Sequence, residues 1–235
     1  MLSSEIGRHL IMAEIHVTMQ NKGGIGTTLV AKMLVQFFIA QKTSVDVIDG
    51  DPWHQPLHAL SHLVRCYNII NTTNNHGYLA QYDDLIDHIE NHQQDIIIID
   101  FSSMLVRDFM EYAHKHNLFG MLDGLGHSIT IHMVRASGLL EAECMSGIKD
   151  ISNTYRNHAQ FVIWDNCFFD ARAGSTDINP HIFDNEFGTA KRIYLKRYDP
   201  LFSRDFQMFL SKHCSFANFI SDTRHPISTR MRIQH

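Results

Sequence analysis

The stretch of sequence that decides the fold is residues 21–28, Asn-Lys-Gly-Gly-Ile-Gly-Thr-Thr. A β-like run over residues 14–19 leads into it, and an apolar, helix-like run over residues 29–40 follows it. Closely spaced glycines let backbone amides curl around an anion, and the amino-terminal end of a helix adds a partial positive charge. Strand, glycine-rich turn and helix in this order therefore predict a phosphate-binding loop.

The loop departs from the general phosphate-loop pattern at one place. Gly-x-x-x-x-Gly-Lys-[Ser/Thr] requires a lysine after its last glycine, and Thr27 stands there, while Lys22 precedes the first glycine. An ammonium about 4 Å from a phosphate oxygen is worth up to about 4 kcal/mol at an effective dielectric of 20. Its loss would weaken binding by about two to three orders of magnitude and would harm the transition state more. We expect slow or absent hydrolysis.

Apolar runs alternate between strand-like and helix-like spacing along the whole chain. Strand-like runs occupy residues 15–19, 44–48, 96–99, 129–134, 161–164 and 193–195, and helix-like runs occupy residues 28–41, 79–92, 106–117, 138–155 and 202–213. The four consecutive isoleucines at 96–99 suit a central strand that is buried on both faces. The pattern predicts an α/β fold with a mostly parallel central sheet flanked by helices.

Length and composition are those of an ordinary globular protein. The chain has 235 residues, of which 44% are hydrophobic and 19% charged, and a formal net charge of −5. We expect one domain over residues 1–235, with residues 1–12 a short, poorly ordered leader, Met12 an alternative start, and residues 165–188 a long loop. The cysteines are widely spaced, which fits reduced thiols. Reduced thiols are typical of the cytoplasm, so we expect a cytoplasmic protein. No apolar run approaches the roughly 20 residues of a membrane span.

Three aspartates stand where predicted strands end. Asp49 and Asp51 follow the second strand in Asp-Gly-Asp-Pro, and Asp100 follows the four isoleucines. In a parallel sheet, ligands bind at the carboxyl ends of the strands, and an aspartate there beside a phosphate loop typically holds Mg²⁺. Aspartate after a strand is also a common turn residue, but three of them beside a glycine loop favour a magnesium site.

At these residues the chain resembles the ParA/MinD superfamily, the deviant Walker A ATPases. The family pattern is Lys-Gly-Gly-x-Gly-Lys-[Ser/Thr], and residues 22–28 match it everywhere except at Thr27. Residues 49–52, Asp-Gly-Asp-Pro, resemble the family's second-strand Asp-x-Asp-Pro element, and Asp100 resembles its Walker B aspartate. The resemblance implies a nucleotide-binding protein.

Within the superfamily, the chain is most similar to the TraL-type conjugal-transfer ATPases and the StbB-type plasmid-stability proteins. The cues are softer than the loop motif and extend from about residue 13 to residue 232. They are Leu-Gly-His at 125–127, Gly-Leu-Leu at 138–140, Phe-Val-Ile-Trp-Asp-Asn at 161–166 and Pro-Ile-Ser-Thr-Arg-Met-Arg at 226–232. This resemblance implies a role in plasmid conjugal transfer, stability or partition, with a protein partner from such a system.

The resemblance also implies how nucleotide and magnesium would be held. Thr28 would bind Mg²⁺ through its hydroxyl, with Asp49 and Asp100 in the magnesium shell. Backbone amides of the loop would cradle the phosphates of ATP or ADP, and the loop residues concerned are Lys22, Gly23, Gly24, Ile25, Gly26, Thr27 and Thr28.

Three further roles follow from the same resemblance. Lys22 would reach the phosphates of the nucleotide in a second subunit, so that nucleotide would hold a homodimer together. Asp51 would orient or activate the attacking water. Asn166, at the end of a strand, would meet the adenine.

The missing loop lysine leaves three functions open. The protein is a nucleotide switch with ATP-dependent dimerisation and weakened hydrolysis, a non-catalytic pseudo-ATPase scaffold, or a small-molecule kinase or ligase of the dethiobiotin-synthetase type. The retained Lys22, Asp49, Asp51 and Asp100 favour the switch.

Histidines and basic residues form two further patterns, which we interpret as surface features. His54, His58 and His62 repeat at four-residue intervals, as do His88 and His92, but the sequence offers no obvious cysteine or carboxylate that completes a zinc site. The last third of the chain is richer in lysine and arginine, which would allow non-specific contact with DNA. The negative net charge does not favour that contact.

Overall fold

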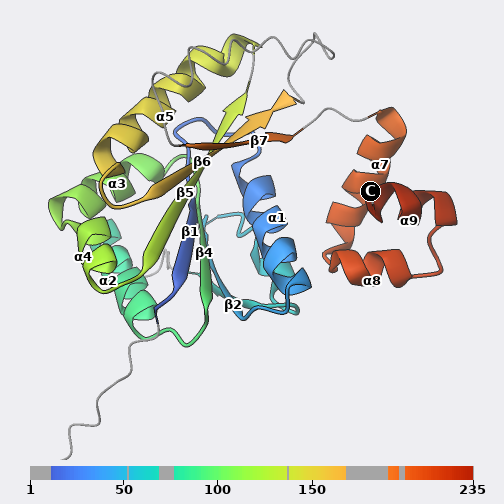
Figure 1. Cartoon of the computed structure of the whole chain (residues 1–235), viewed down its shortest axis with the longest axis horizontal. Coiled ribbons are helices and arrows are strands. Elements are labelled where there is room, and N and C mark those ends of the chain that lie inside the picture. The colour runs from blue at the N-terminus through green and yellow to red at the C-terminus, as the bar shows by residue number, and fades with distance from the viewer. Residues whose placement is uncertain are drawn as a thin grey trace, which may run out of the picture.

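The computed structural model describes residues 12–51, 53–68, 77–136, 138–167, 190–195 and 199–234. The expected leader, except for Met12, and most of the expected loop at 165–188 lie outside these residues. A central sheet separates two layers of helices (Figure 1). The expected α/β class is thus confirmed.

In the part of the chain that the structure describes, the sheet has seven strands in the order β3-β2-β4-β1-β5-β6-β7. Every neighbouring pair is parallel. The strands are β1 (Glu14–Thr18), β2 (Val45–Gly50), β3 (Arg65–Asn68), β4 (Ile96–Phe101), β5 (Ser128–Ala136), β6 (Gln160–Asn166) and β7 (Lys191–Leu195). Because β1 and β4 are neighbouring central strands, the loops that follow them lie side by side at the carboxyl ends of the strands, in the middle of the sheet.

Helices cover both faces of the sheet. One face carries α2 (Gly77–Glu90), α3 (Val106–Lys115), α4 (Leu118–Gly124) and α5 (Glu141–Tyr155), and the other carries α1 (Thr27–Ala40) (Figure 1). Two single 3₁₀ turns are η1 (His58–Leu60) and η2 (Gly138–Leu140). Beyond α1 lie three C-terminal helices, α7 (Pro200–Lys212), α8 (Phe216–Ser221) and α9 (Ile227–Gln234) (Figure 1).

Alternation along the central strands builds two hydrophobic cores. In β4, Ile97 and Ile99 join the core beneath α2 to α5, and Ile98 joins the core beneath α1. Side chains of successive strand residues point to opposite faces, so a run that is apolar at every position fills both cores. The expectation drawn from the four isoleucines is confirmed.

Several element boundaries differ from the expectation. The helix expected over residues 106–117 is present as α3, which ends two residues earlier, and α4 was not expected. Asn117, between the two helices, has a left-handed backbone conformation (φ 49°). Asparagine tolerates this conformation better than most residues. The edge strand β3 was missed because its four residues lack a clear apolar pattern.

The C-terminal helices form a small unit with its own apolar contacts, which the sequence analysis missed after residue 213. Phe209, Phe219 and Ile233 form its buried centre. Gln36 of α1 fixes the unit to the sheet domain, because its side-chain amide donates to the Cys214 carbonyl (3.1 Å) and its side-chain oxygen accepts from the Phe216 amide (3.0 Å).

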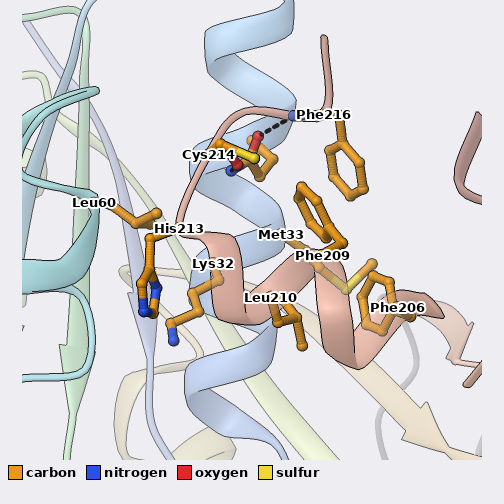
Figure 2. Close-up of a pocket in the computed structure, with 10 residues that line it drawn as sticks. Lys32, Met33, Leu60, Phe206, Phe209, Leu210, His213, Cys214 and Phe216 are labelled. Carbon is orange, nitrogen blue, oxygen red and sulfur yellow. Dashed lines mark hydrogen bonds between the residues drawn. The ribbon is translucent and has the colours of Figure 1, made fainter. Parts of the chain in front are cut away.

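The space between α1 and α7 is too small for an organic ligand. Its volume is about 20 Å³, which is room for about one water molecule. Figure 2 shows aromatic side chains of α7 directed at Met33 of α1. Within the described residues, no helix combines the length and hydropathy that crossing a membrane requires.

Candidate functional site

The glycine-rich loop connects the carboxyl end of β1 to the amino-terminal end of α1. Gly24 (φ 75°) and Gly26 (φ 105°) have left-handed backbone conformations, which glycine adopts without the steric cost of a Cβ atom. Gly26 is the N-cap residue of α1 and has no side chain that could cap the helix. The first backbone amides of α1 therefore remain suited to an anionic ligand.

Two neighbouring loops press closely on this turn. A Cβ atom at Gly23 would lie 2.8 Å from Ser103 Oγ, and one at Gly26 would lie 3.0 Å from Asn166 Nδ2. The Asn166 amide donates to the Ile25 carbonyl at 2.8 Å. Asn166, expected at the adenine, thus supports the turn from the end of β6, and its contact with adenine stays a prediction.

A buried glutamine anchors the beginning of the loop. Gln20 Nε2 donates to the carbonyls of Val134 (2.9 Å) and Cys144 (3.3 Å), and Gln20 Oε1 accepts from the Asn21 amide (2.8 Å). Gly147 of α5 leaves the space for this side chain, because a Cβ atom there would lie 2.3 Å from Gln20 Oε1. The loop is therefore tied to both β5 and α5.

Asp100 lies at the centre of the site and is 2% exposed. It is the register partner of Asp49 on β2 and of Thr18 on β1. Burial raises the pKa of Asp100 to about 7, against hydrogen bonds from the Thr18 and Thr28 hydroxyls, which lower it. No basic side chain of the described residues forms an ion pair with it. The carboxyl and the Thr28 hydroxyl thus lie together, as the magnesium prediction requires.

The other two predicted aspartates organise the loop after β2. Asp49 Oδ1 accepts from the Asp51 amide (3.1 Å), and Asp49 Oδ2 accepts from the Leu57 amide (2.7 Å). Asp51 Oδ1 accepts from the amides of Trp53 and His54. Both carboxylates therefore hold backbone turns, and their roles toward magnesium and water stay predictions.

Two lysines flank the loop. Lys22 Nζ lies 2.7 Å from Glu143 Oε2 on α5. Lys32 lies on α1 one turn after Thr28, and burial lowers its pKa while the charges of Asp100 and Asp49 oppose that shift. Neither lysine takes the place of the phosphate-loop lysine in the sequence, where Thr27 stands.

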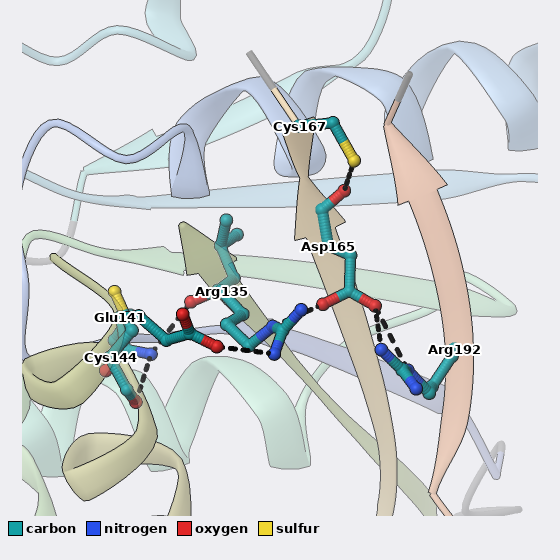
Figure 3. A network of polar contacts seen from close by, with 8 residues as sticks. Arg135, Glu141, Cys144, Asp165, Cys167 and Arg192 are labelled. Atoms are coloured by element: carbon teal, nitrogen blue, oxygen red, sulfur yellow. Dashed lines mark hydrogen bonds and ion pairs between the residues drawn. The ribbon is translucent and has the colours of Figure 1, made fainter. Parts of the chain in front are cut away.

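A second polar cluster joins the carboxyl ends of β5 and β6 to Arg192, near the beginning of β7 (Figure 3). Asp165 lies between two arginines: Arg135 Nε donates to its Oδ1 (2.6 Å), and Arg192 Nη2 donates to its Oδ2 (2.7 Å). Arg135 also pairs with Glu141 of α5 (3.0 Å). The cluster balances two positive charges with two negative ones, and it joins three strands to α5.

Two of the histidines that we interpreted as surface residues, one on α2 and one just after it, are not exposed on the surface. His88 and His92 are largely buried, and a carboxylate that the sequence analysis did not identify, Asp46 Oδ2, lies 3.7 Å from His88 Nε2. Even so, no three potential ligands among the described residues are grouped so that they could hold a metal ion. The residues around His58 form turns and η1, so His54, His58 and His62 do not share one face of a helix.

Sequence reasoning missed three residues that shape the site. Gln20, Ser103 and Glu143 carry no motif of their own, and each acts through a contact between segments distant in sequence. Position gave a signal for two of them, since Gln20 directly precedes the loop and Ser103 closely follows Asp100. Nothing in the sequence connects Glu143 to Lys22.

Comparisons with known proteins identify relatives that match nearly the whole chain. Two Escherichia coli proteins named TraL are 25% and 24% identical to the chain over 233 residues, which cover 95% of this chain and 93% of each relative. No protein-family profile matches the chain.

Solved structures agree in fold. A chain of the MinC:MinD cell division complex from Aquifex aeolicus has a TM-score of 0.55 at 12% identity, covering 94% of this chain and 93% of its own. An ADP-bound nucleotide-binding protein from Archaeoglobus fulgidus has a TM-score of 0.55 at 11% identity, covering 86% and 87%. A plasmid partition protein from Borrelia burgdorferi has a TM-score of 0.50 at 11% identity, covering 86% and 95%. The chain therefore has the phosphate-loop fold of ParA/MinD-type proteins and is similar to TraL over nearly its whole length.

Proposed function

We propose that the protein is a nucleotide-binding switch that acts in plasmid conjugal transfer, stability or positioning. ATP with Mg²⁺ would bind at the loop and favour a homodimer, and hydrolysis would be slow because Thr27 replaces the loop lysine. The relatives named TraL and the plasmid partition protein of the same fold support the plasmid setting.

One observation carries this proposal. A glycine turn with an uncapped helix end lies beside a buried carboxyl, Asp100, that forms no ion pair with a basic side chain of the described residues. A site of this kind suits an anion and a cation together, since the turn offers amides and the carboxyl offers oxygens. A nucleotide with bound Mg²⁺ supplies both the anion and the cation.

The side chains present fit a magnesium ion. Thr28 and Asp100 offer hard oxygen ligands in mutual contact, and Mg²⁺ in nucleotide sites typically uses one or two protein oxygens together with phosphate oxygens and water. When bound, the ion would neutralise phosphate charge. Asp49 would keep the loop after β2 in place through its two backbone contacts.

Titration calorimetry on the natural chain and on Thr27→Lys tests the proposal. With Mg²⁺ and ATP, we expect measurable binding by the natural chain and about 10²- to 10³-fold tighter binding by Thr27→Lys, because an added ammonium faces the phosphates. Thr27→Met, with a long uncharged side chain, is the matched control and should bind like the natural chain. Light scattering then measures the mass with ATP and with ADP.

The outcomes separate the alternatives. An increase in mass with ATP and not with ADP supports the switch. Nucleotide binding by neither the natural chain nor Thr27→Lys would contradict it and favour the pseudo-ATPase scaffold. Binding without dimerisation, together with turnover that needs a small-molecule acceptor, would favour the kinase or ligase.

Contact with DNA stays a secondary prediction. Part of the basic charge near the C-terminus is already paired, because Arg204 and Arg232 contact the buried Asp205 and Arg224 contacts Asp222. The paired arginines contribute less positive field to a surface than free ones would. Retention on DNA that disappears with added salt would support such contact.

A further inference from the structure

We propose that Glu143 is a positioning residue for Lys22: it holds the lysine within its own subunit and competes with nucleotide phosphate for the ammonium. The inference rests on the proposed function, in which Lys22 binds phosphate. It adds a regulatory contact to that site. Nothing in the loop motif predicts it, because Glu143 lies on α5.

The contact itself is direct. Lys22 Nζ lies 2.7 Å from Glu143 Oε2, within the range of a charge-assisted hydrogen bond. The Lys22 side chain is 34% exposed and that of Glu143 is 61% exposed. The lysine is thus partly covered while its partner remains open to solvent, so the pair can separate without moving the core.

The backbones of the two residues are held in a fixed relation. Gln20, two residues before Lys22, donates to the Cys144 carbonyl, directly after Glu143, and to the Val134 carbonyl of β5. Glu141 ties the beginning of α5 to the buried Arg135. Because these anchors lie on both sides of the pair, the pair is broken by rotation of the Lys22 and Glu143 side chains, without movement of α5.

The pair is weak enough to be displaced. Exposed ion pairs contribute little because water screens them and because two long side chains lose rotational freedom. The triphosphate of ATP carries more negative charge than one carboxylate, so phosphate should displace Glu143 once it is in the loop. Removal of the carboxylate should therefore change nucleotide affinity about two- to fivefold.

Glu143→Gln tests the proposal on the full-length protein, with Glu141→Gln as the matched control. Both variants remove one negative charge from the first turn of α5, but Glu141 contacts Arg135 and not Lys22. Acetylation of Lys22 by N-hydroxysuccinimide acetate, followed by peptide mass spectrometry, reports whether the ammonium is held. Calorimetry with Mg²⁺ and ATP reports the competition.

We expect Glu143→Gln to raise the Lys22 acetylation rate of the nucleotide-free protein two- to fivefold and to tighten ATP binding by a similar factor. Glu141→Gln should change neither quantity, because its side-chain amide oxygen can still accept from Arg135 and keep the beginning of α5 in place. Equal acetylation rates in Glu143→Gln and the natural chain would overturn the assigned contact. Faster acetylation with unchanged ATP affinity would overturn the competition and leave the proposed switch standing. Absence of ATP binding in the natural chain, Glu143→Gln and Thr27→Lys would overturn both proposals.

Discussion

Two aspartates are buried at the carboxyl ends of the strands, and their electrostatic surroundings are opposite. Asp100, at the end of β4, is 2% exposed and contacts hydroxyls, and its pKa is raised by burial to about 7. Asp165, near the end of β6, is 1% exposed and lies between Arg135 and Arg192 (Figure 3). Among the described residues, the Asp100 carboxyl forms no ion pair, whereas the Asp165 carboxyl forms ion pairs with two arginines.

The difference distinguishes a carboxylate that stabilises the fold from one that is suited to binding a ligand. A carboxylate that is buried between arginines already has its counter-charge and acts within the fold. A carboxyl that is buried without one is unfavourable unless a cation arrives or a proton binds. Carboxyls with strongly shifted pKa values cluster at functional sites. Asp100 therefore indicates a functional site, and Asp165 does not.

The largest expected effect comes from breaking the Asp165 cluster. Asp165→Asn removes the charge that both arginines share and takes one counter-charge from the buried Arg135. Removal of one partner of a buried ion pair typically costs about 3–5 kcal/mol. We expect the free energy of unfolding, measured in urea, to fall by about that amount.

The chain contains a matched control for this variant. Asp222 and Arg224 pair at 2.7 Å, the distance between Asp165 and Arg192, but the Arg224 side chain is 88% exposed. Asp222→Asn should therefore change the unfolding free energy far less than Asp165→Asn. Equal losses in the two variants would show that burial does not set the value of the Asp165 cluster.

The fold was largely predictable because its signals are local. The loop at residues 22–28 and the isoleucines at 96–99 each fix a strand and its surroundings, and Asp100 follows directly. The Asp165 cluster and the Lys22–Glu143 pair were not predictable, because they join side chains that only the sheet order brings together. Helices α8 and α9 were missed because each is short and packs one narrow face.

A third way of burying titratable groups lies beneath α1, where histidines are kept neutral. Trp164 Nε1 donates to His132 Nδ1 (3.0 Å), His132 Nε2 lies 2.9 Å from His16 Nδ1, and His16 Nε2 lies 3.1 Å from Glu14. Burial lowers the pKa of His132 to about 3 and also lowers that of His16. In the unfolded chain a histidine has a pKa of about 6.5.

The sign of the pH effect follows from these values. Between pH 6.5 and pH 3 the unfolded chain binds a proton at His132 that the folded chain does not bind, so stability falls as pH falls. Each such group contributes about 1.4 kcal/mol per pH unit. Urea unfolding from pH 7 to pH 5 should therefore show a shallower slope for His132→Gln than for the natural chain. A comparable change in His54→Gln, whose histidine is exposed, would contradict this assignment.

The smallest expected change in stability comes from Asp100→Asn, and it would sharpen the comparison most. The amide keeps an oxygen that can accept from Thr18 and Thr28, and the substitution removes a buried charge that forms no ion pair with a described basic side chain. One hydrogen bond is worth about 0.5–1.5 kcal/mol net, so the unfolding free energy should stay within about 1.5 kcal/mol of the natural value, or rise.

The same variant should lose the Mg²⁺-dependent part of ATP binding, because a neutral amide is a poor magnesium ligand. A large loss of stability without any change in the Mg²⁺ dependence of binding would place Asp100 with Asp165, as a residue of the architecture alone.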